Sequence, residues 1–261
     1  MNWKTAILSI SILFWKVSIH GQVQNDVLRE LQTGDFTTFK NFSDSLSDKE
    51  QRISAHWEML RDLTEEFREG VFIFEKSVPD EHDPNVSSVY TFKVKLIATK
   101  TRIASYELSE QKNRKVADHW EPYDDLINKF RDEKLLEELK NSFSILFHAP
   151  LNEQDLFINN LTYGEHCGIV GTPPKGRSQV IQFVKNRNKD ELIKWLQSAN
   201  SEKQVYAVDG LYQLYKKGTK LTENELQMIA FVMQKSGSIS VCSGCIYSKD
   251  TIKSILSNFR F

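Results

Sequence analysis

Residues 90–108 have the sequence YTFKVKLIATKTRIASYEL. Apolar and polar side chains alternate from Tyr90 to Leu96, and this period of two indicates a half-buried β-strand. Residues 101–108 are expected to form its hairpin partner. The alternative is one long helix over residues 89–118, because several of the same apolar residues also fit a helical stripe. The β-branched and aromatic content favours the two strands.

The chain before this hairpin has the pattern of a helix. Ser47-Asp48-Lys49-Glu50 matches the S-x-x-E capping box that begins helices. A helix is therefore expected to run to about Arg68, with Gly70 ending it. Its buried face consists of apolar residues three or four positions apart, namely Ile53, Trp57, Leu60, Leu63 and Phe67. Residues 71–74, VFIF, are expected to form a short strand.

The chain after the hairpin has helical spacing again. Leu126, Ile127 and Phe130 form one expected stripe, and residues 135–147 carry a second. A third, short helix is expected over residues 153–161. These segments predict that helices outnumber strands in the part of the chain that surrounds the hairpin.

The C-terminal section is the most regularly patterned part of the chain. Its apolar stripes predict helices over residues 190–197, 201–217, 222–236 and 249–256. Short helices joined by brief turns must stack to bury their apolar faces. Residues 189–217, KDELIKWLQSANSEKQVYAVDGLYQLYKK, resemble one helix pair of a HEAT-type repeat, and the resemblance extends over about residues 189–236. This resemblance implies a protein-binding scaffold that carries no chemistry of its own.

These patterns predict an α+β fold that is mostly helical. Residues 22–150 are expected to form an α+β domain, with helices around a small antiparallel sheet. Residues 151–177 form a junction, because the Gly- and Pro-containing stretch within them should not be crossed by a regular element. Residues 178–261 are expected to form a helical, HEAT-like domain of antiparallel helix pairs.

The first 21 residues have the pattern of a secretory signal peptide. A basic start at Lys4 precedes the apolar run TAILSISILFW over residues 5–15. That run is shorter than the roughly 20 apolar residues that a membrane span requires. Cleavage is expected after Gly21, and a buried N-terminal helix or an uncleaved anchor is the alternative. The mature protein is therefore expected to be secreted or periplasmic and not to span a membrane.

Length and composition narrow the function classes. The 261 residues can form one large domain or two small ones, and 40% hydrophobic and 11% aromatic content can fill a core, which excludes wholesale disorder. The chain has 34 basic and 35 acidic residues, so it lacks the positive excess that nucleic-acid binding requires. The expected partner is therefore a protein or a cell-envelope component, and not a nucleic acid.

The cysteines are the most informative residues for chemistry. Cys167, Cys242 and Cys245 all follow the predicted signal peptide, and an oxidising compartment favours disulfides. One hypothesis is a structural disulfide from Cys167 to Cys242 or Cys245. A second is a redox-active pair of Cys242 and Cys245. A third is a zinc site that combines the three thiolates with His166 or another histidine. The remaining alternatives are three free thiols or a disulfide between two chains.

Other catalytic patterns are missing from the sequence. GxSxG, HExxH and GxGxxG do not occur, and Lys175 is followed by Gly176 where a phosphate-binding loop requires Ser or Thr. We therefore expect no catalytic residues, no metal and no cofactor. The leading hypothesis is an exported, non-enzymatic binding protein. The alternative is a redox protein or enzyme that uses Cys167, Cys242 and Cys245.

Overall fold

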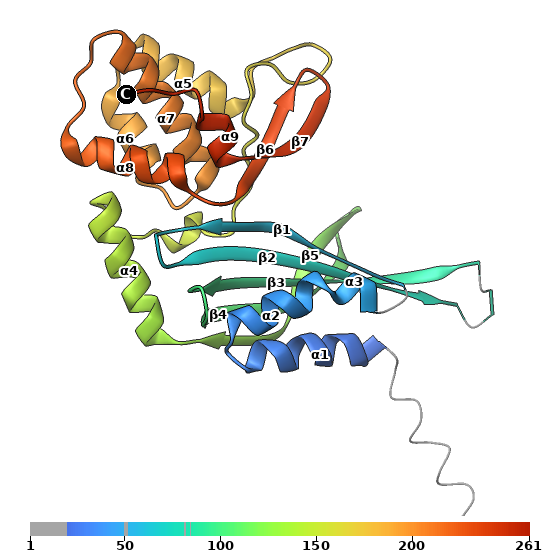
Figure 1. Ribbon diagram of the computed structural model, residues 1–261. Coiled ribbons are helices and arrows are strands. Elements are labelled where there is room, and N and C mark those ends of the chain that lie inside the picture. The colour runs from blue at the N-terminus through green and yellow to red at the C-terminus, as the bar shows by residue number, and fades with distance from the viewer. Residues whose placement is uncertain (1–19, 50–51, 81, 84) are drawn as a thin grey trace, which may run out of the picture.

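The computed structural model describes residues 20–49, 52–80, 82–83 and 85–261 (Figure 1). Residues 1–19 of the predicted signal peptide lie outside the described residues. Its last two residues, His20 and Gly21, begin the first helix.

The N-terminal half is an antiparallel sheet with three helices on one face (Figure 1). The strands follow one another in space as they do in sequence: β1 (Ile53–Asp62), β2 (Arg68–Pro79), β3 (Ser87–Ala98), β4 (Ile103–Val116) and β5 (His119–Arg131). The helices are α1 (His20–Gln32), α2 (Phe36–Asp44) and α3 (Leu46–Lys49). Apolar side chains of α1 at Val23, Val27 and Leu31 form a stripe that packs on the sheet.

The remaining elements form a helical layer beyond the opposite face and one end of the sheet (Figure 1). They are α4 (Glu133–Phe147), a 3-10 turn (Glu153–Asp155), α5 (Lys175–Lys185), α6 (Lys189–Leu196), α7 (Ser201–Lys216), α8 (Glu223–Gln234), β6 (Ser238–Ser243), β7 (Ile246–Thr251) and α9 (Ile252–Leu256). The apolar core of this layer also includes Leu63, Phe67, Ile97 and Ala104 from the sheet half. The division of the chain at residues 151–177 stays a prediction.

The prediction of a mostly helical fold is wrong, because a large sheet replaces two of the expected helices. The segment expected to be helical over about 49–68 contains β1 and the start of β2. A β-bulge between Trp57 and Met59 shifts the alternation of β1 by one residue. Ile53, Trp57 and Leu60 therefore face the same core at intervals of four and three residues, which imitates a helix. Ser47 does not cap this segment: its Oγ accepts a hydrogen bond from the Ala55 amide at 2.8 Å.

The second replaced helix is the stripe of Leu126, Ile127 and Phe130, which lies in β5. This strand pairs with β4 along its whole length, and a bulge opposite Leu108 and Ser109 disturbs its alternation. Leu126 and Phe130 are exposed, so their spacing does not reflect a buried helical face.

The hairpin predicted at residues 90–108 is confirmed by the pairing of β3 with β4. The sheet is larger than predicted, because this hairpin lies within a five-stranded sheet. The C-terminal half is not built from helix pairs alone, because it also contains the β6–β7 hairpin. The helix predicted over residues 249–256 is shorter, because residues 249–251 end β7 and α9 follows them. The helix predicted over residues 153–161 is reduced to a 3-10 turn.

The helices predicted in the C-terminal section correspond to α6, α7 and α8, and α6 packs closely with α7. Asn200 closes the N-terminus of α7, because its side chain accepts a hydrogen bond from the Lys203 amide. The HEAT-like character of this pair stays a prediction. None of the helices in the described ranges has the length and apolar character that a membrane span requires.

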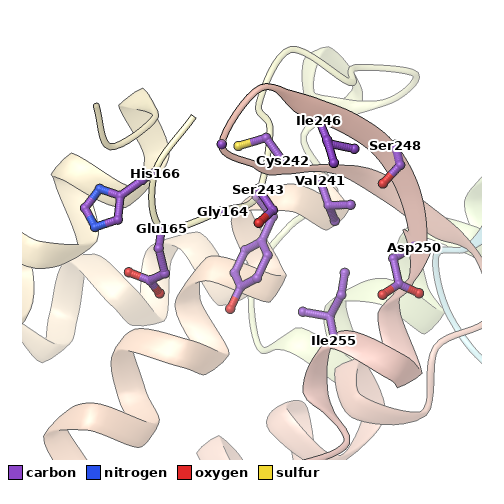
Figure 2. A pocket seen from close by; sticks show the side chains of 12 residues that line it. Gly164, Glu165, His166, Val241, Cys242, Ser243, Ile246, Ser248, Asp250 and Ile255 are labelled. Atoms are coloured by element: carbon purple, nitrogen blue, oxygen red, sulfur yellow. The ribbon is translucent and has the colours of Figure 1, made fainter. Parts of the chain in front are cut away.

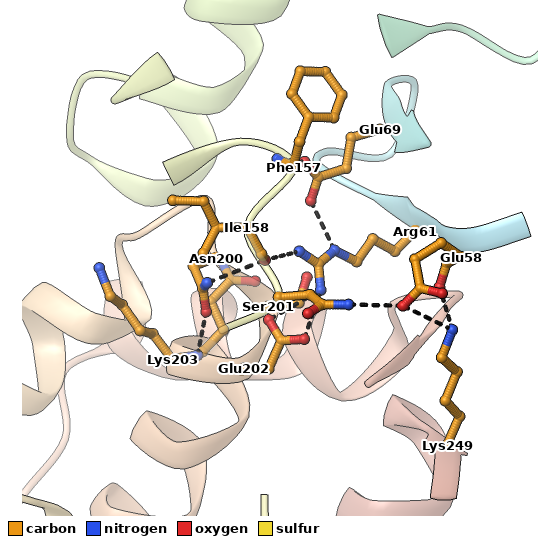
Figure 3. A network of polar contacts seen from close by, with 12 residues as sticks. Glu58, Arg61, Glu69, Phe157, Ile158, Asn200, Ser201, Glu202, Lys203 and Lys249 are labelled. Atoms are coloured by element: carbon orange, nitrogen blue, oxygen red, sulfur yellow. Dashed lines mark hydrogen bonds and ion pairs between the residues drawn. The ribbon is translucent and has the colours of Figure 1, made fainter. Parts of the chain in front are cut away.

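A buried ion cluster joins the sheet to the helical layer (Figure 3). Arg61, at the end of β1, donates through Nε to Glu69 at 2.7 Å and through Nη1 to Glu202 of α7 at 2.9 Å. Its Nη2 donates to the Ile158 carbonyl at 2.6 Å. The three ionic side chains are 1% exposed or less. Burial alone would lower the pKa of Arg61, but the two carboxylates outweigh it and raise that pKa.

Lys235 lies beside this cluster, directly after α8, and is also buried. Its Nζ donates to Ser201 Oγ at 2.9 Å and to Gln204 Oε1 at 2.7 Å. These two acceptors match the two N–H groups of a neutral amine. The third proton of an ammonium group would add a positive charge in a site that is buried away from water. Burial and the charge of Arg61 lower the pKa of Lys235 to about 7, although neighbouring carboxylates oppose this shift.

We expect Lys235 to make stability depend on pH. Its pKa is about 7 in the folded chain and 10.5 for an ordinary lysine, so between these values the unfolded state binds more protons. The contribution of Lys235 to the free energy of unfolding therefore rises as pH increases from about 7 towards 10.5. Denaturant unfolding across this range should show a shallower rise for Lys235→Met than for the wild type. The exposed control Lys216→Met should keep the wild-type slope, and equal slopes for all three proteins would contradict the expectation.

Candidate functional site

The structure joins Cys167 to Cys242 in a disulfide, and Cys245 is free and exposed. The bonded residues are 75 positions apart and their Cα atoms are 5.6 Å apart, a usual separation for a disulfide. The disulfide is compatible with an exported protein. In this oxidised state the alternative zinc set of His166 and three thiolates lacks two thiolates. Within the described ranges, no group of three or more His, Cys, Asp or Glu residues could hold a metal ion.

A short segment before Cys167 brings the two cysteines together by running parallel beside β6. The Tyr163 amide donates to the Ser240 carbonyl at 2.8 Å, and the Cys242 amide donates to the Tyr163 carbonyl at 2.9 Å. Further along, the Gly168 amide donates to the Gly244 carbonyl at 2.7 Å. The segment therefore occupies one edge of β6, while β7 occupies the other.

Two features of the sequence allow this close approach. A Cβ atom at Gly164 would collide with the sulfur and the carbonyl oxygen of Cys242, so only glycine lets the segment reach β6. Beyond Cys167 the chain reverses in a tight turn in which Gly168 and Gly171 have φ values of +73° and +65°. The Cys167 amide closes this turn by donating to the Thr172 carbonyl at 2.9 Å. The glycines of the predicted irregular stretch thus build a specific loop.

A buried arginine holds the base of this loop against the helices. The rings of Tyr163 and Tyr206 pack against each other, and the Arg177 guanidinium lies beside both, 5.2 and 5.3 Å from their centroids. Its Nη1 is 2.6 Å from an Asp209 carboxylate oxygen, and its Nε donates to the Gly164 carbonyl at 3.1 Å. Charge and cation–π contacts together fix α5, through Arg177, to α7 and to the loop segment.

The two tyrosines in this clamp act as hydrogen-bond donors. Tyr163 donates to Asp209 at 3.0 Å, and Tyr206 donates to the Thr162 carbonyl at 2.7 Å. Burial raises the pKa of Tyr206 to about 12 and also raises that of Tyr163. Both hydroxyls therefore stay protonated at neutral pH, which suits a structural role and does not suit a general base.

An open groove of about 470 Å³ lies between the loop, the β6–β7 hairpin and α9 (Figure 2). Figure 2 shows Glu165 and His166 on one side of the groove and Ser248 and Asp250 on the other. The apolar part of its lining consists of Tyr163, Val241, Ile246 and Ile255. This mixture of apolar and acidic groups is suited to binding and contains no arrangement that identifies a reaction.

The loop turn and the hairpin turn form an exposed apolar surface, which we name the tip. It consists of Ile169 and Val170 in the loop turn and of Ile246 and Tyr247 at the start of β7, and these residues are 93%, 86%, 70% and 63% exposed. The hydrogen bond from Gly168 to Gly244 places the two turns side by side. Large apolar side chains that are exposed close together are typical of interaction surfaces.

The predicted site residues therefore have different positions and roles in the structure. Cys167 and Cys242 are bonded, and His166 lines the adjacent groove, while Cys245 lies in the hairpin turn. Sequence reasoning missed the Arg177 clamp and the tip. The signal for the tip is the sequence Gly168-Ile169-Val170-Gly171, in which two large apolar residues sit between turn-forming glycines.

Thiol labelling should distinguish the three cysteines. When the denatured protein is treated with iodoacetamide without a reductant, only Cys245 is expected to be alkylated, because the disulfide protects the other two. All three should react after reduction, and peptide mass spectrometry locates each label. The Cys245→Ser variant should take up no label before reduction. Labelling of Cys167 or Cys242 in the unreduced protein would contradict this pairing.

Comparison with known proteins gives no match to a protein family, to a curated protein or to a solved structure. The function is therefore argued from the geometry of the loop, the hairpin and the tip.

Proposed function

We propose that this chain is an exported, non-enzymatic protein that binds another protein through the tip. The observation that carries the proposal is the exposure of Ile169, Val170, Ile246 and Tyr247 on two turns that a disulfide and backbone hydrogen bonds hold together. When a partner covers large apolar side chains, the free energy of the complex falls by about 25 cal/mol per Å² of apolar area buried.

The way the tip is held supports binding. The Cys167–Cys242 disulfide and the Arg177 clamp fix the loop before any partner arrives. A partner then has less conformational entropy to remove, which increases affinity for a given contact area. The predicted signal peptide and the disulfide together support binding outside the cytoplasm.

The test compares recovery of proteins from the extracellular or envelope fraction of the source organism. The bait is the exported protein, and the tip variant is Ile169→Ser/Ile246→Ser. The matched control, Ile145→Ser/Leu226→Ser, changes exposed apolar residues on α4 and α8 instead. We expect a specific partner whose recovery falls at least about tenfold with the tip variant, a loss of about 1.4 kcal/mol, and not with the control. Equal recovery of every protein by both variants would overturn the proposal.

The position of Cys245 favours a second candidate, a thiol-exchange function. Cys245 is exposed in the turn three residues after Cys242. Its thiolate could attack the Cys242 sulfur, forming a Cys242–Cys245 bond and releasing the Cys167 thiolate. This exchange conserves electrons and needs no external oxidant. An insulin-reduction assay with dithiothreitol as the reductant tests this candidate: turnover above the uncatalysed rate that Cys245→Ser abolishes would support it and count against the non-enzymatic proposal.

A further inference from the structure

The outer edge of β7 has no neighbouring strand among the described residues. β7 pairs on one side with β6, and the segment that contains Tyr163 occupies the far side of β6. The order is therefore the loop segment, then β6, then β7. An edge strand presents a row of backbone N–H and C=O groups that another extended chain can pair with.

The register of the hairpin identifies which groups point outward. Ser243 and Ile246 flank a two-residue turn, so they form a hydrogen-bonded pair, as do Val241 and Ser248 two residues further on. The residues between these pairs use their backbone groups on the opposite side. The N–H and C=O groups of Tyr247 and Lys249 therefore point away from β6, at the two-residue spacing that an added strand needs.

Two of the usual protections of an edge strand, a proline and a β-bulge, are missing from β7. Its one lysine is directed elsewhere: Lys249 Nζ donates to the Glu58 carbonyl at 2.5 Å and lies 3.3 Å from the Glu58 carboxylate (Figure 3). The lysine charge is thus partly neutralised by Glu58 of β1, which weakens its protection of the edge.

The groove beside β7 indicates what kind of chain would fit. Ile246, Ser248 and Asp250 lie on one face of β7 and line the groove, as alternate residues of a strand do. A chain added to β7 would place its own alternate side chains over the same groove. An apolar side chain would meet Ile246 and Ile255 (Figure 2). A basic one would meet the carboxylate of Asp250, which among the described residues accepts only from the neutral donors of Thr251 and Ser254. Glu165, in contrast, already pairs with Arg177.

We propose that β7 binds an extended peptide segment of the partner protein as an added strand, with an apolar and a basic residue of that segment in the groove. This inference rests on the proposed function, because it names how a partner engages the hairpin that carries the tip. Backbone hydrogen bonds supply affinity in this mode of binding, and the groove supplies specificity.

The probe is a displayed library of random nonapeptides selected on the full-length exported protein. Enriched peptides are synthesised and N-methylated at one amide at a time. Because only alternate amides of an added strand face β7, affinity should fall about tenfold or more at every second position and change less than about threefold at the others. This readout does not depend on the folding of any protein variant.

Two substitutions at one position test the protein side. Lys249→Pro removes an outward-facing amide, whereas Lys249→Ala keeps the amide and loses only the contact with Glu58. We expect the proline variant to lose at least about tenfold in peptide affinity and the alanine variant to bind as the wild type does. Equal affinity of the two variants would overturn the inference, as would N-methyl effects without a period of two or a selection that yields no peptide dependent on the β7 edge. Partner recovery that still requires Ile169 would, in those cases, leave the proposed function standing.

Discussion

Replacing Arg61 with alanine is expected to destabilise the protein by about 3–5 kcal/mol, because two buried carboxylates would lose their cation. Glu69 and Glu202 are both 1% exposed or less and are bonded to the same guanidinium. Without it, each must stay charged in a dry site or take up a proton on folding. Urea unfolding of the disulfide-bonded protein measures this loss.

The ion pair of Arg68 with Asp62 supplies the control. Its atoms are 3.4 Å apart and both side chains are partly exposed, so Arg68→Ala should cost less than about 1 kcal/mol. The double variant Arg61→Met/Glu202→Gln should recover part of the loss, since it removes charges of both signs. A loss below about 1 kcal/mol for Arg61→Ala would mean that water reaches this cluster.

Removing the disulfide is expected to have the second largest effect. The Cys167→Ser/Cys242→Ser variant should lose about 4 kcal/mol of unfolding free energy, because a link across 75 residues restricts the unfolded chain. It should also weaken any binding at the tip, since the loop loses its covalent tie to the hairpin.

The matched control for this prediction is Cys245→Ser, which removes an exposed thiol outside the disulfide. Its unfolding free energy should stay within about 0.5 kcal/mol of the wild type. If Cys245→Ser were as destabilising as the double variant, Cys245 would have to belong to the structural bond.

Local patterns were predictable from the sequence, and pairing across the chain was not. The alternation from Tyr90 to Leu96 identifies β3 because no bulge interrupts the pairing of that stretch with β4. The same reasoning failed for β1, where the bulge after Trp57 produces helical spacing within a strand. In β5 the apolar residues are partly exposed, so their spacing carries no information about a core.

The candidate site was predictable only in its residue types. The cysteines predicted a disulfide, but the choice between Cys242 and Cys245 depends on how residues 75 positions away approach β6. That approach depends on Gly164 and Arg177, whose partners are remote in sequence. The tip depends on the same approach, because it exists only where two distant turns meet.

The interlocking of the sheet with the helical layer has a consequence for how the molecule comes apart. Arg61 reaches from β1 to α7, and Ile97 and Ala104 belong to the same apolar core as the helices. Neither half can detach without exposing charges and hydrocarbon that the other half covers. A protease nick within residues 151–166, before the disulfide-bonded Cys167, should therefore leave the two pieces associated, and calorimetry should record a single melting transition.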